Sequence, residues 1–563
     1  MALNLALAIL IPASLGLAVL AGSLGVILPA MGVDPVTGQN QLSIAAFAQL
    51  SAMPGFWRAA FLSYVSGLAA TIIAVLVVFG FLATAQSSRR IAERVIGPLL
   101  AVPHAAAAIG IAFLLAPSGF IMRLLSPWAT GYDRPPDWLI PGDPLGLSLI
   151  AGLVVKEVPF IFLVTIAALP LVQEPARMKL AASLGYARVA GWLKTVAPDA
   201  YARVRLPILA VIAYATSNVE VALVLGPSHP PTLAILTFRL MYDPDLTMRT
   251  VAAAAACAQI GVTILAIITW LGLEKLCRYT IDRSITSGRR DRPSQIFGRL
   301  AEINLFSVVL ATGLLLIGLI ITSFSWRWRF PDAWPASFSL QHWQRASPNL
   351  MEPMANSVLL ASVAALLGLI IIMALLESHA KLKIPGTWQM ATTFMLFLPL
   401  LVPQIGFMAG LVTMVEWIGL GPSFWVVLFG HLIMVVPYLY LTTKDPFDKT
   451  DSRYIKIAAS LGHSPLSTLL RVRLPLLSTA LFASAAIAFA VSIGQYLPTL
   501  LLGAGRTVTV TNEAVALVAS GDRRTLGVWA LIQTLLPALC FTLAIYWPRW
   551  QWRGRRGMQA MRP

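Results

Sequence analysis

The sequence predicts an all-α, polytopic membrane protein with about 12 transmembrane helices, arranged as two parallel six-helix repeats. Three observations lead to this fold class. The 563 residues are 58% hydrophobic and only 12% charged, whereas an average soluble domain is about a quarter charged. Apolar runs of about 20 residues, long enough to cross a bilayer core, recur along the whole chain. The phrase "KLAASLG" at 179–185 returns as "KIAASLG" at 456–462.

Each apolar run is expected to be a helix, because lipid offers open backbone groups no hydrogen-bonding partner. The runs of the first half lie at 5–30, 62–85, 95–116, 145–170, 206–225 and 251–273, and those of the second half at 303–324, 357–376, 390–412, 424–441, 476–502 and 526–546. Pro103 and Pro403 are expected to bend the third run of each half, since proline disrupts a helix interior.

The distribution of basic residues predicts the orientation of the chain. With the N-terminus inside, 29 of the 41 Lys and Arg residues fall in segments that face the cytoplasm: 87–94, 173–205, 275–302, 378–388, 443–475 and 548–563. This matches the positive-inside rule and places both termini in the cytoplasm. The orientation of the chain in the membrane therefore explains the net charge of +17. We expect membrane lipid as a partner and no nucleic acid. Cys257, Cys277 and Cys540 stand singly, without the spacing of a metal site, so no metal is expected.

The two halves align at a single offset. Lys179 and Lys456, Gly185 and Gly462, and Pro198 and Pro475 are each 277 residues apart, and nearly fifty residues align there without a gap. Two copies with six crossings each share one orientation, as parallel repeats do. We therefore divide the chain into a first half (1–274), a basic cytoplasmic linker (275–302) and a second half (303–563). The repeated phrase lies in the cytoplasmic loops 173–205 and 443–475.

The repeated phrase resembles a known family motif. A small-residue phrase, a glycine, a gap of ten to fifteen residues and a proline, placed before the penultimate crossing, are similar to the EAA loop of the membrane subunits of binding-protein-dependent ABC importers. The fused, double-length layout resembles the iron(III) and thiamine branch, including an uncharacterised group proposed to carry thiamine. The resemblance implies the type I permease fold of ABC importers, with each loop forming a coupling helix that docks on a separate ATPase subunit.

Carried over residue by residue, the resemblance implies ten ATPase-coupling residues: Lys179, Ala181, Ala182, Gly185, Pro198, Lys456, Ala458, Ala459, Gly462 and Pro475. The paired alanines are expected to leave a low surface for close approach by another protein. Both copies depart from the family in having lysine where the motif has an acidic residue, so a salt bridge from that position to an ATPase arginine is not implied.

The resemblance implies the permease of an ATP-driven importer in a bacterial inner membrane. It would move a small solute from a periplasmic binding protein into the cytoplasm by alternating access. The resemblance favours a thiamine-like solute or iron(III), and a polyamine or another small solute stays open. No GxxxxGK[ST] phosphate-binding motif occurs. We therefore expect no catalytic residues and no cofactor on this chain, with ATP and Mg bound by two copies of a partner ATPase.

Polar residues inside the crossings are candidates for the translocation pathway, because a central charge costs about 2.5 to 3.5 kcal/mol on insertion scales. An ordinary hydrogen bond between helices is the alternative role for the amides. The candidates are His104, Lys156, Glu157, Asn218, Glu220, Gln404 and Gln495.

Two other classes of protein compete with this interpretation. A secondary transporter of 6+6 design would run on an ion gradient and would give the repeated phrase no role. A membrane-embedded enzyme would need a cluster of catalytic side chains, and the six histidines are scattered along the chain.

Overall fold

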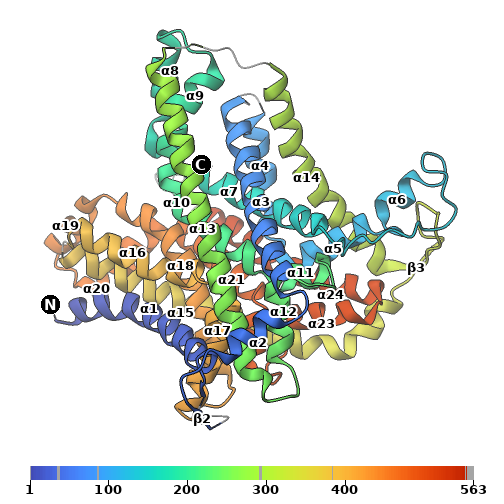
Figure 1. Ribbon diagram of the computed structural model, residues 1–563. Coiled ribbons are helices and arrows are strands. Elements are labelled where there is room, and N and C mark those ends of the chain that lie inside the picture. The colour runs from blue at the N-terminus through green and yellow to red at the C-terminus, as the bar shows by residue number, and fades with distance from the viewer. Residues whose placement is uncertain are drawn as a thin grey trace.

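The computed structural model describes residues 2–34, 38–84, 88–288, 290, 295–382, 384–551 and 553. Within these residues the protein is built almost entirely of helices (Figure 1). The strands described there form two short antiparallel hairpins, β1 (Val33–Asp34) with β2 (Gln39–Asn40) and β3 (Ser325–Arg327) with β4 (Ser337–Phe338). The predicted all-α class is confirmed.

Each half is a series of long helices joined by shorter ones. The first half contains α1 (Ala2–Ala30), α2 (Ala45–Ala52), α3 (Phe56–Thr84), α4 (Arg89–Leu99), α5 (His104–Leu115), α6 (Phe120–Leu125), α7 (Leu147–Ala168), η1 (Leu169–Val172), α8 (Glu174–Ser183), α9 (Arg188–Thr195), α10 (Ala197–Ser217), α11 (Glu220–Leu225), α12 (Leu233–Met241) and α13 (Met248–Thr286). The second half contains α14 (Gln295–Phe324), α15 (Gln341–Leu382), α16 (Gly386–Leu401), α17 (Gln404–Trp417), α18 (Phe424–Asp448), α19 (Ser452–Ser460), α20 (Pro465–Thr468), η2 (Leu469–Arg473), α21 (Leu474–Ile493), α22 (Leu497–Gly503), α23 (Val510–Ala516), η3 (Leu517–Ser520) and α24 (Arg523–Gln551).

In the described part of the chain, ten helical segments are long and apolar enough to cross a membrane, or eleven if the bent pair α16 and α17 is one span. About twelve crossings were expected. The remaining run, 206–225, falls in α10 and α11. Helix α10 is not among the ten, since Arg203 and Arg205 lie in its first half and lower its hydropathy.

The third crossing of each half is broken at a proline. Helix α4 ends at Leu99, and α5 starts directly after Pro103. Helix α16 ends at Leu401, and α17 starts directly after Pro403 with a bend of 95°. Proline has no backbone N–H and fits the start of a helix better than its interior, so it sets the break in both halves.

The predicted linker is largely helical where it is described. Helix α13 continues to Thr286, and α14 starts at Gln295. Between them, residues 289 and 291–294 lie outside the described residues.

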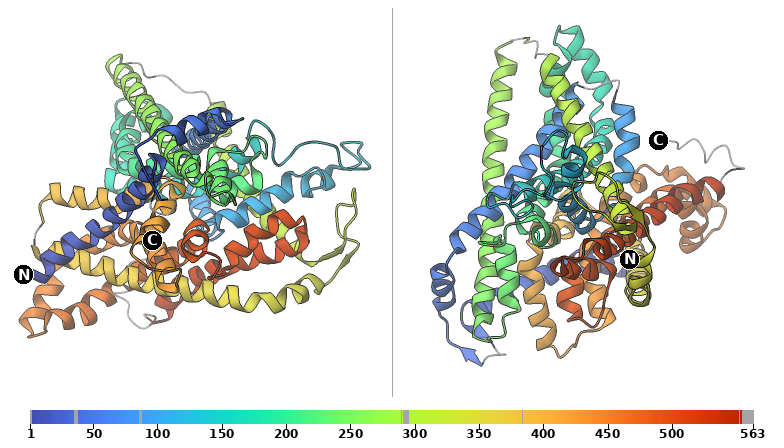
Figure 2. Two further views of the ribbon diagram at one scale, coloured as in Figure 1. Left: turned by 60° about the horizontal axis from the view of Figure 1, so that its bottom comes forward. Right: turned by 90° about the vertical axis from the view of Figure 1, so that its right-hand side faces the viewer.

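The first helix of each half packs on the other half. Helix α1 lies along α15, α16 and α17, and α14 lies along α3, α5 and α7 (Figures 1 and 2). Glycines permit the closest of these contacts: a Cβ added at Gly22 or Gly25 would fall on the backbone carbonyl of Phe407 or Gly410. Small residues at such crossings let helix backbones approach each other in a membrane.

This exchange makes one core from two halves. The largest apolar cluster contains Leu15 and Phe113 from the first half together with Phe407 and Met408 from the second. Neither half is therefore packed completely without the other.

Candidate functional site

The two copies of the repeated phrase form helices with matching ends. Gly185 follows α8 and Gly462 follows α19, both with a φ of +81°. The residue after each glycine donates its backbone N–H to a carbonyl five residues earlier, from Tyr186 to Ala181 at 3.0 Å and from His463 to Ala458 at 3.1 Å. This is a Schellman ending, and it favours glycine because side chains rarely tolerate positive φ.

Both helices turn large apolar side chains outward. Leu180 of α8 and Leu184 directly after it are 61% and 50% exposed. Their equivalents, Ile457 of α19 and Leu461 directly after it, are 55% and 74% exposed. The lysines of the phrase, Lys179 and Lys456, are exposed beside them. Paired exposed apolar side chains of this kind are typical of a protein interaction surface.

The alanines of each phrase do not act as a pair. Ala182 and Ala459 are exposed, whereas Ala181 and Ala458 are buried. A Cβ added to Gly191 of α9 would lie 3.0 Å from the Cβ of Ala181. Ala181 is therefore covered by the neighbouring helix α9. Close approach by another protein was expected at this position.

The prolines of the motif mark the start of the next long helix in each half. Pro198 lies in the first turn of α10 and Pro475 in the first turn of α21, where a missing N–H costs no hydrogen bond. Helix α10 begins two residues after α9 ends and reaches Ser217, and α21 likewise runs from the repeated loop to Ile493. Each loop is thus joined directly to a helix of about 30 Å.

The two loops are anchored differently. Arg89 of α4 donates to Glu174 of α8 at 2.6 Å, and the indole of Trp192 donates to the same carboxylate at 3.0 Å. Burial acts to lower the pKa of the Arg89 guanidinium, but Glu174 and Glu93 raise it overall. In the second half, Arg473 pairs with Glu377 of α15 and lies 4.5 Å from the ring centroid of Phe447.

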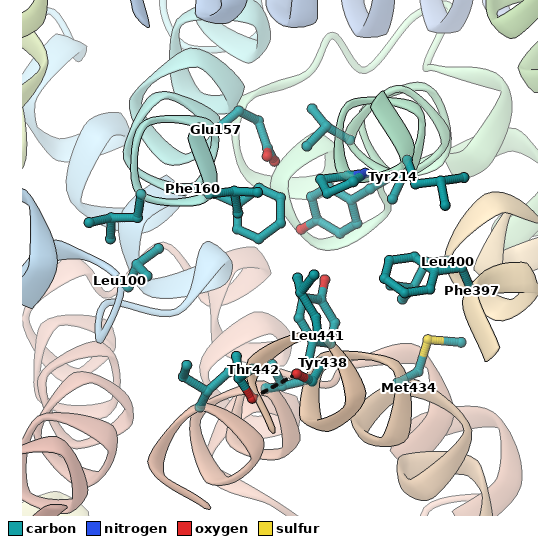
Figure 3. A pocket seen from close by; sticks show the side chains of 18 of the residues that line it. Leu100, Glu157, Phe160, Tyr214, Phe397, Leu400, Met434, Tyr438, Leu441 and Thr442 are labelled. Carbon is teal, nitrogen blue, oxygen red and sulfur yellow. Dashed lines mark hydrogen bonds between the residues drawn. The ribbon is translucent and has the colours of Figure 1, made fainter. Parts of the chain in front are cut away.

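A cavity of about 960 Å³ lies between the halves and is lined by residues of both (Figure 3). It extends from the breaks in the third crossings to Arg203, Lys444 and Lys449 beside the two repeated loops. The structure brings all seven predicted pathway residues into its lining: His104, Lys156, Glu157, Asn218, Glu220, Gln404 and Gln495.

Lys156 supports the break in the third crossing of the first half. Its Nζ donates to the backbone carbonyl of Val102, between α4 and α5, and the side chain is 5% exposed. The broken helix leaves this carbonyl without a helical partner, so the lysine provides the missing donor. Lys156 and Glu157 are neighbours on α7 and make no ion pair with each other within 4 Å among the described pairs.

Two carboxylates and two rings occupy the first-half side of the cavity. Nε2 of His104 lies 3.5 Å from Oε1 of Glu157, and the imidazole lies 4.6 Å from the ring of Tyr214, centroid to centroid. The hydroxyl of Tyr214 donates to Glu220 at 2.9 Å. Figure 3 shows Glu157 and Tyr214 directed into the cavity.

Asn218 and Gln495 occupy equivalent places in the two halves, directly after α10 and near the end of α21. Oδ1 of Asn218 accepts from the backbone N–H of Val221 at 2.6 Å, and Nε2 of Gln495 donates to the carbonyl of His431 at 3.4 Å. Each amide therefore has one partner within its own half.

Comparison with known proteins identifies the family. The inner membrane ABC transporter permease protein YnjC of Escherichia coli is 30% identical over 466 residues, which cover 82% of each chain. The chain belongs to the ABC importer permeases. Residues 367–547 also match the family model of the binding-protein-dependent transport system inner membrane component.

Two shorter permeases are similar to part of the chain. The spermidine/putrescine transport system permease protein PotC of Haemophilus influenzae is 27% identical over 167 residues, 29% of this chain and 64% of that relative. The PotC homolog of Mycoplasma genitalium is 25% identical over 185 residues, 32% of this chain and 62% of that relative.

Membership of this family makes the protein a multi-pass translocation subunit of the inner membrane. Permeases of this family work with a separate ATPase and a periplasmic binding protein. In the described residues of this permease, no group of three or more His, Cys, Asp and Glu side chains is placed to hold a metal ion.

The apolar and aromatic lining of the cavity was not predicted from the sequence. Phe160 and Tyr438, which are 278 residues apart, meet edge to face with centroids 6.4 Å apart. Met434 lies beside them and accepts a hydrogen bond at Sδ from Gln404 at 3.1 Å. The offset of the repeats could have paired Phe160 with Tyr438, but nothing in the sequence separates them from other aromatic residues of the crossings.

Replacing Lys156 with Met, the residue at the equivalent position 434, is expected to destabilise the permease by about 1 to 3 kcal/mol, because the buried carbonyl of Val102 would lose its donor. Thermal unfolding of the purified protein in detergent measures this effect. Lys381→Met, at an exposed position near the end of α15, is the control. Equal melting temperatures for the two variants would show that Lys156 does not support the break.

Proposed function

We propose that the permease moves a small solute into the cytoplasm by alternating access, driven by two copies of an ATPase that dock on α8 and α19. A periplasmic binding protein delivers the solute on the other side. Both termini and both repeated loops are then cytoplasmic, as the distribution of basic residues favours.

The matched pair of loop helices is the observation that carries the proposal. They share a Schellman ending at Gly185 and Gly462 and expose apolar side chains at equivalent positions. One chain with two such helices offers two docking sites of similar shape. Because the anchoring contacts differ, with Glu174 held by Arg89 on one side and Arg473 by Glu377 on the other, the two sites are not identical.

Helices α10 and α21 provide a mechanical route from docking site to cavity. Each starts at a repeated loop and ends beside an amide of the cavity lining, Asn218 or Gln495. A packed helix transmits displacement along its length with little deformation. Movement of the loops by ATP-driven closure of the ATPase pair would therefore shift the two cavity walls against each other.

The cavity has the size of a small-molecule site, for which about 300 to 1,000 Å³ is typical. A thiamine-like solute fits this range. An iron(III) cargo remains the alternative solute from the family resemblance. The names of the two shorter relatives add spermidine and putrescine as solutes to include in uptake assays.

Native mass spectrometry of the tagged chain, extracted from its own membrane in mild detergent, tests the proposal. We expect a complex with two ATPase copies for each chain. A chain that stays alone in several detergents, and that takes up solute in proteoliposomes from an ion gradient without ATP, would contradict the proposal and favour a secondary transporter.

A further inference from the structure

The cavity has pseudo-symmetric walls with different chemistry. Positions paired by the repeat carry His104 and Gln404, Lys156 and Met434, Glu157 and Val435, Phe160 and Tyr438, Asn218 and Gln495, and Glu220 and Leu497. In four of these pairs one member is His, Lys or Glu, and in all four that member belongs to the first half. Charged lining residues of the second half, such as Lys444 and Asp445, belong to the repeated loop 443–475.

Glu157 is placed to bind a positive charge. The residue is 3% exposed, and its Oε1 has no hydrogen-bond donor among the described residues. Nε2 of His104 lies 3.5 Å from this oxygen but makes no hydrogen bond with it. The nearby cation, Lys156, is occupied by the carbonyl of Val102, and the hydroxyl of Tyr214 donates to Glu220 instead. A buried carboxylate without a donor is unfavourable until a cation or a donor approaches it.

The amides of the two halves offer one donor and one acceptor that the protein leaves unused. Nδ2 of Asn218 and Oε1 of Gln495 are buried and have no hydrogen-bond partner in the described structure. Both side chains line the cavity. Buried polar atoms are nearly always paired, so unpaired atoms on a cavity wall indicate a place for a ligand or water.

The second-half side of the cavity is apolar and aromatic. Phe397, Leu400, Met434 and Tyr438 lie across from Glu157 in Figure 3. Their faces suit a hydrocarbon or aromatic body, and an aromatic ring near a cation adds electrostatic attraction.

We propose that this cavity binds a small organic cation with an apolar body, its positive group against Glu157 and its body against the wall formed by Phe397, Leu400, Met434 and Tyr438. The inference rests on the proposed function in one respect, that the cavity is the solute path. The inference also gives the fusion of two unlike halves a function. A dimer of identical chains would place the same charges on both walls of the cavity. This chain has different walls and can therefore orient an amphipathic solute.

Charge-selective labelling of a single cysteine tests the inference without ATP or a known substrate. Cys257, Cys277 and Cys540 are replaced by Ser, and Leu400→Cys provides a thiol on the apolar wall. The probes are two methanethiosulfonates of similar size, one with a trimethylammonium group and one with a sulfonate. The measured quantity is the labelling rate of the cationic reagent divided by that of the anionic one. We expect this ratio to be about tenfold higher at this thiol than with free cysteine, because a cleft of one charge sign concentrates counter-ions.

Glu157→Gln should remove this preference, whereas Asp445→Asn, which deletes the same charge at the mouth of the cavity, should leave it in place. Benzyltrimethylammonium should protect the thiol from labelling, and benzenesulfonate should not. A thiol without charge preference, or one whose preference survives Glu157→Gln, would overturn the inference. The inference would also be overturned if neither reagent labelled the thiol of Leu400→Cys or that of Leu441→Cys. Because no ATPase takes part, failure of the proposed ATPase coupling would leave these results unchanged.

Discussion

Replacing Leu184 and Leu461 together with Asp is expected to abolish ATP-driven uptake while the permease remains inserted in the membrane. Both side chains are exposed, at 50% and 74%, so their loss should not disturb the fold. On docking they would be buried, and exchanging a buried leucine for a carboxylate costs about 2 to 4 kcal/mol at each site. We expect uptake to fall at least about a hundredfold, which corresponds to about 2.7 kcal/mol.

The measurement combines uptake in proteoliposomes with native mass spectrometry of the complex. The ATPase should be absent from the double variant, and each single variant should retain one copy. Leu139→Asp, at an apolar position that is 66% exposed in the segment between α6 and α7 and outside both repeated loops, is the matched control and should keep both copies. Normal uptake in the double variant would show that α8 and α19 are not the docking helices.

Replacing Gly25 with Leu is expected to prevent stable packing of α1 on the second half. The added side chain would start on the backbone of α17, with its Cβ only 2.9 Å from the Cα of Gly410. Overpacking commonly costs about 1 to 3 kcal/mol, and here neither backbone can move aside without separating the helices. We therefore expect a loss of about 3 kcal/mol or more, and Gly410→Leu should have the same effect.

Gly261→Leu provides the control, because nothing lies within 4 Å of a Cβ added at that position in α13. Thermal stability and elution by size exclusion in detergent distinguish the variants: Gly25→Leu should melt much earlier or aggregate, and Gly261→Leu should resemble the parent. Equal stability of the two leucine variants would mean that the exchanged helix is not packed as the structure places it.

Particular residues show how far sequence reasoning reached. The offset of 277 paired Gly185 with Gly462, and both glycines adopt the same positive φ at equivalent helix ends. The membrane composition predicted the all-α class, and the broken third crossings follow from Pro103 and Pro403. The number of crossings does not follow from hydropathy alone. Helix α10 carries two arginines, which lower its hydropathy, although it occupies the position in the first half that α21 occupies in the second.

Other features had no signal in the sequence. The exchange of α1 and α14 between the halves depends on contacts between residues as distant as Gly25 and Gly410. The burial of Ala181 and Ala458 also had no signal, and Ala181 packs against Gly191 of its own half. The anchoring of Glu174 by Arg89 joins segments 85 residues apart, which local patterns do not encode.

The sequence by itself determined that this is a membrane protein of two related halves, with a repeated loop in each, because lipid requires long apolar helices and a duplication leaves a constant offset. It also provided seven of the polar residues that line the cavity. Only the tertiary structure decided how they are used: Lys156 is committed to a backbone carbonyl, Glu157 has an oxygen without a donor, and an apolar wall faces it. Such roles depend on which side chains from distant segments meet, and distances in space are set by packing of the whole chain.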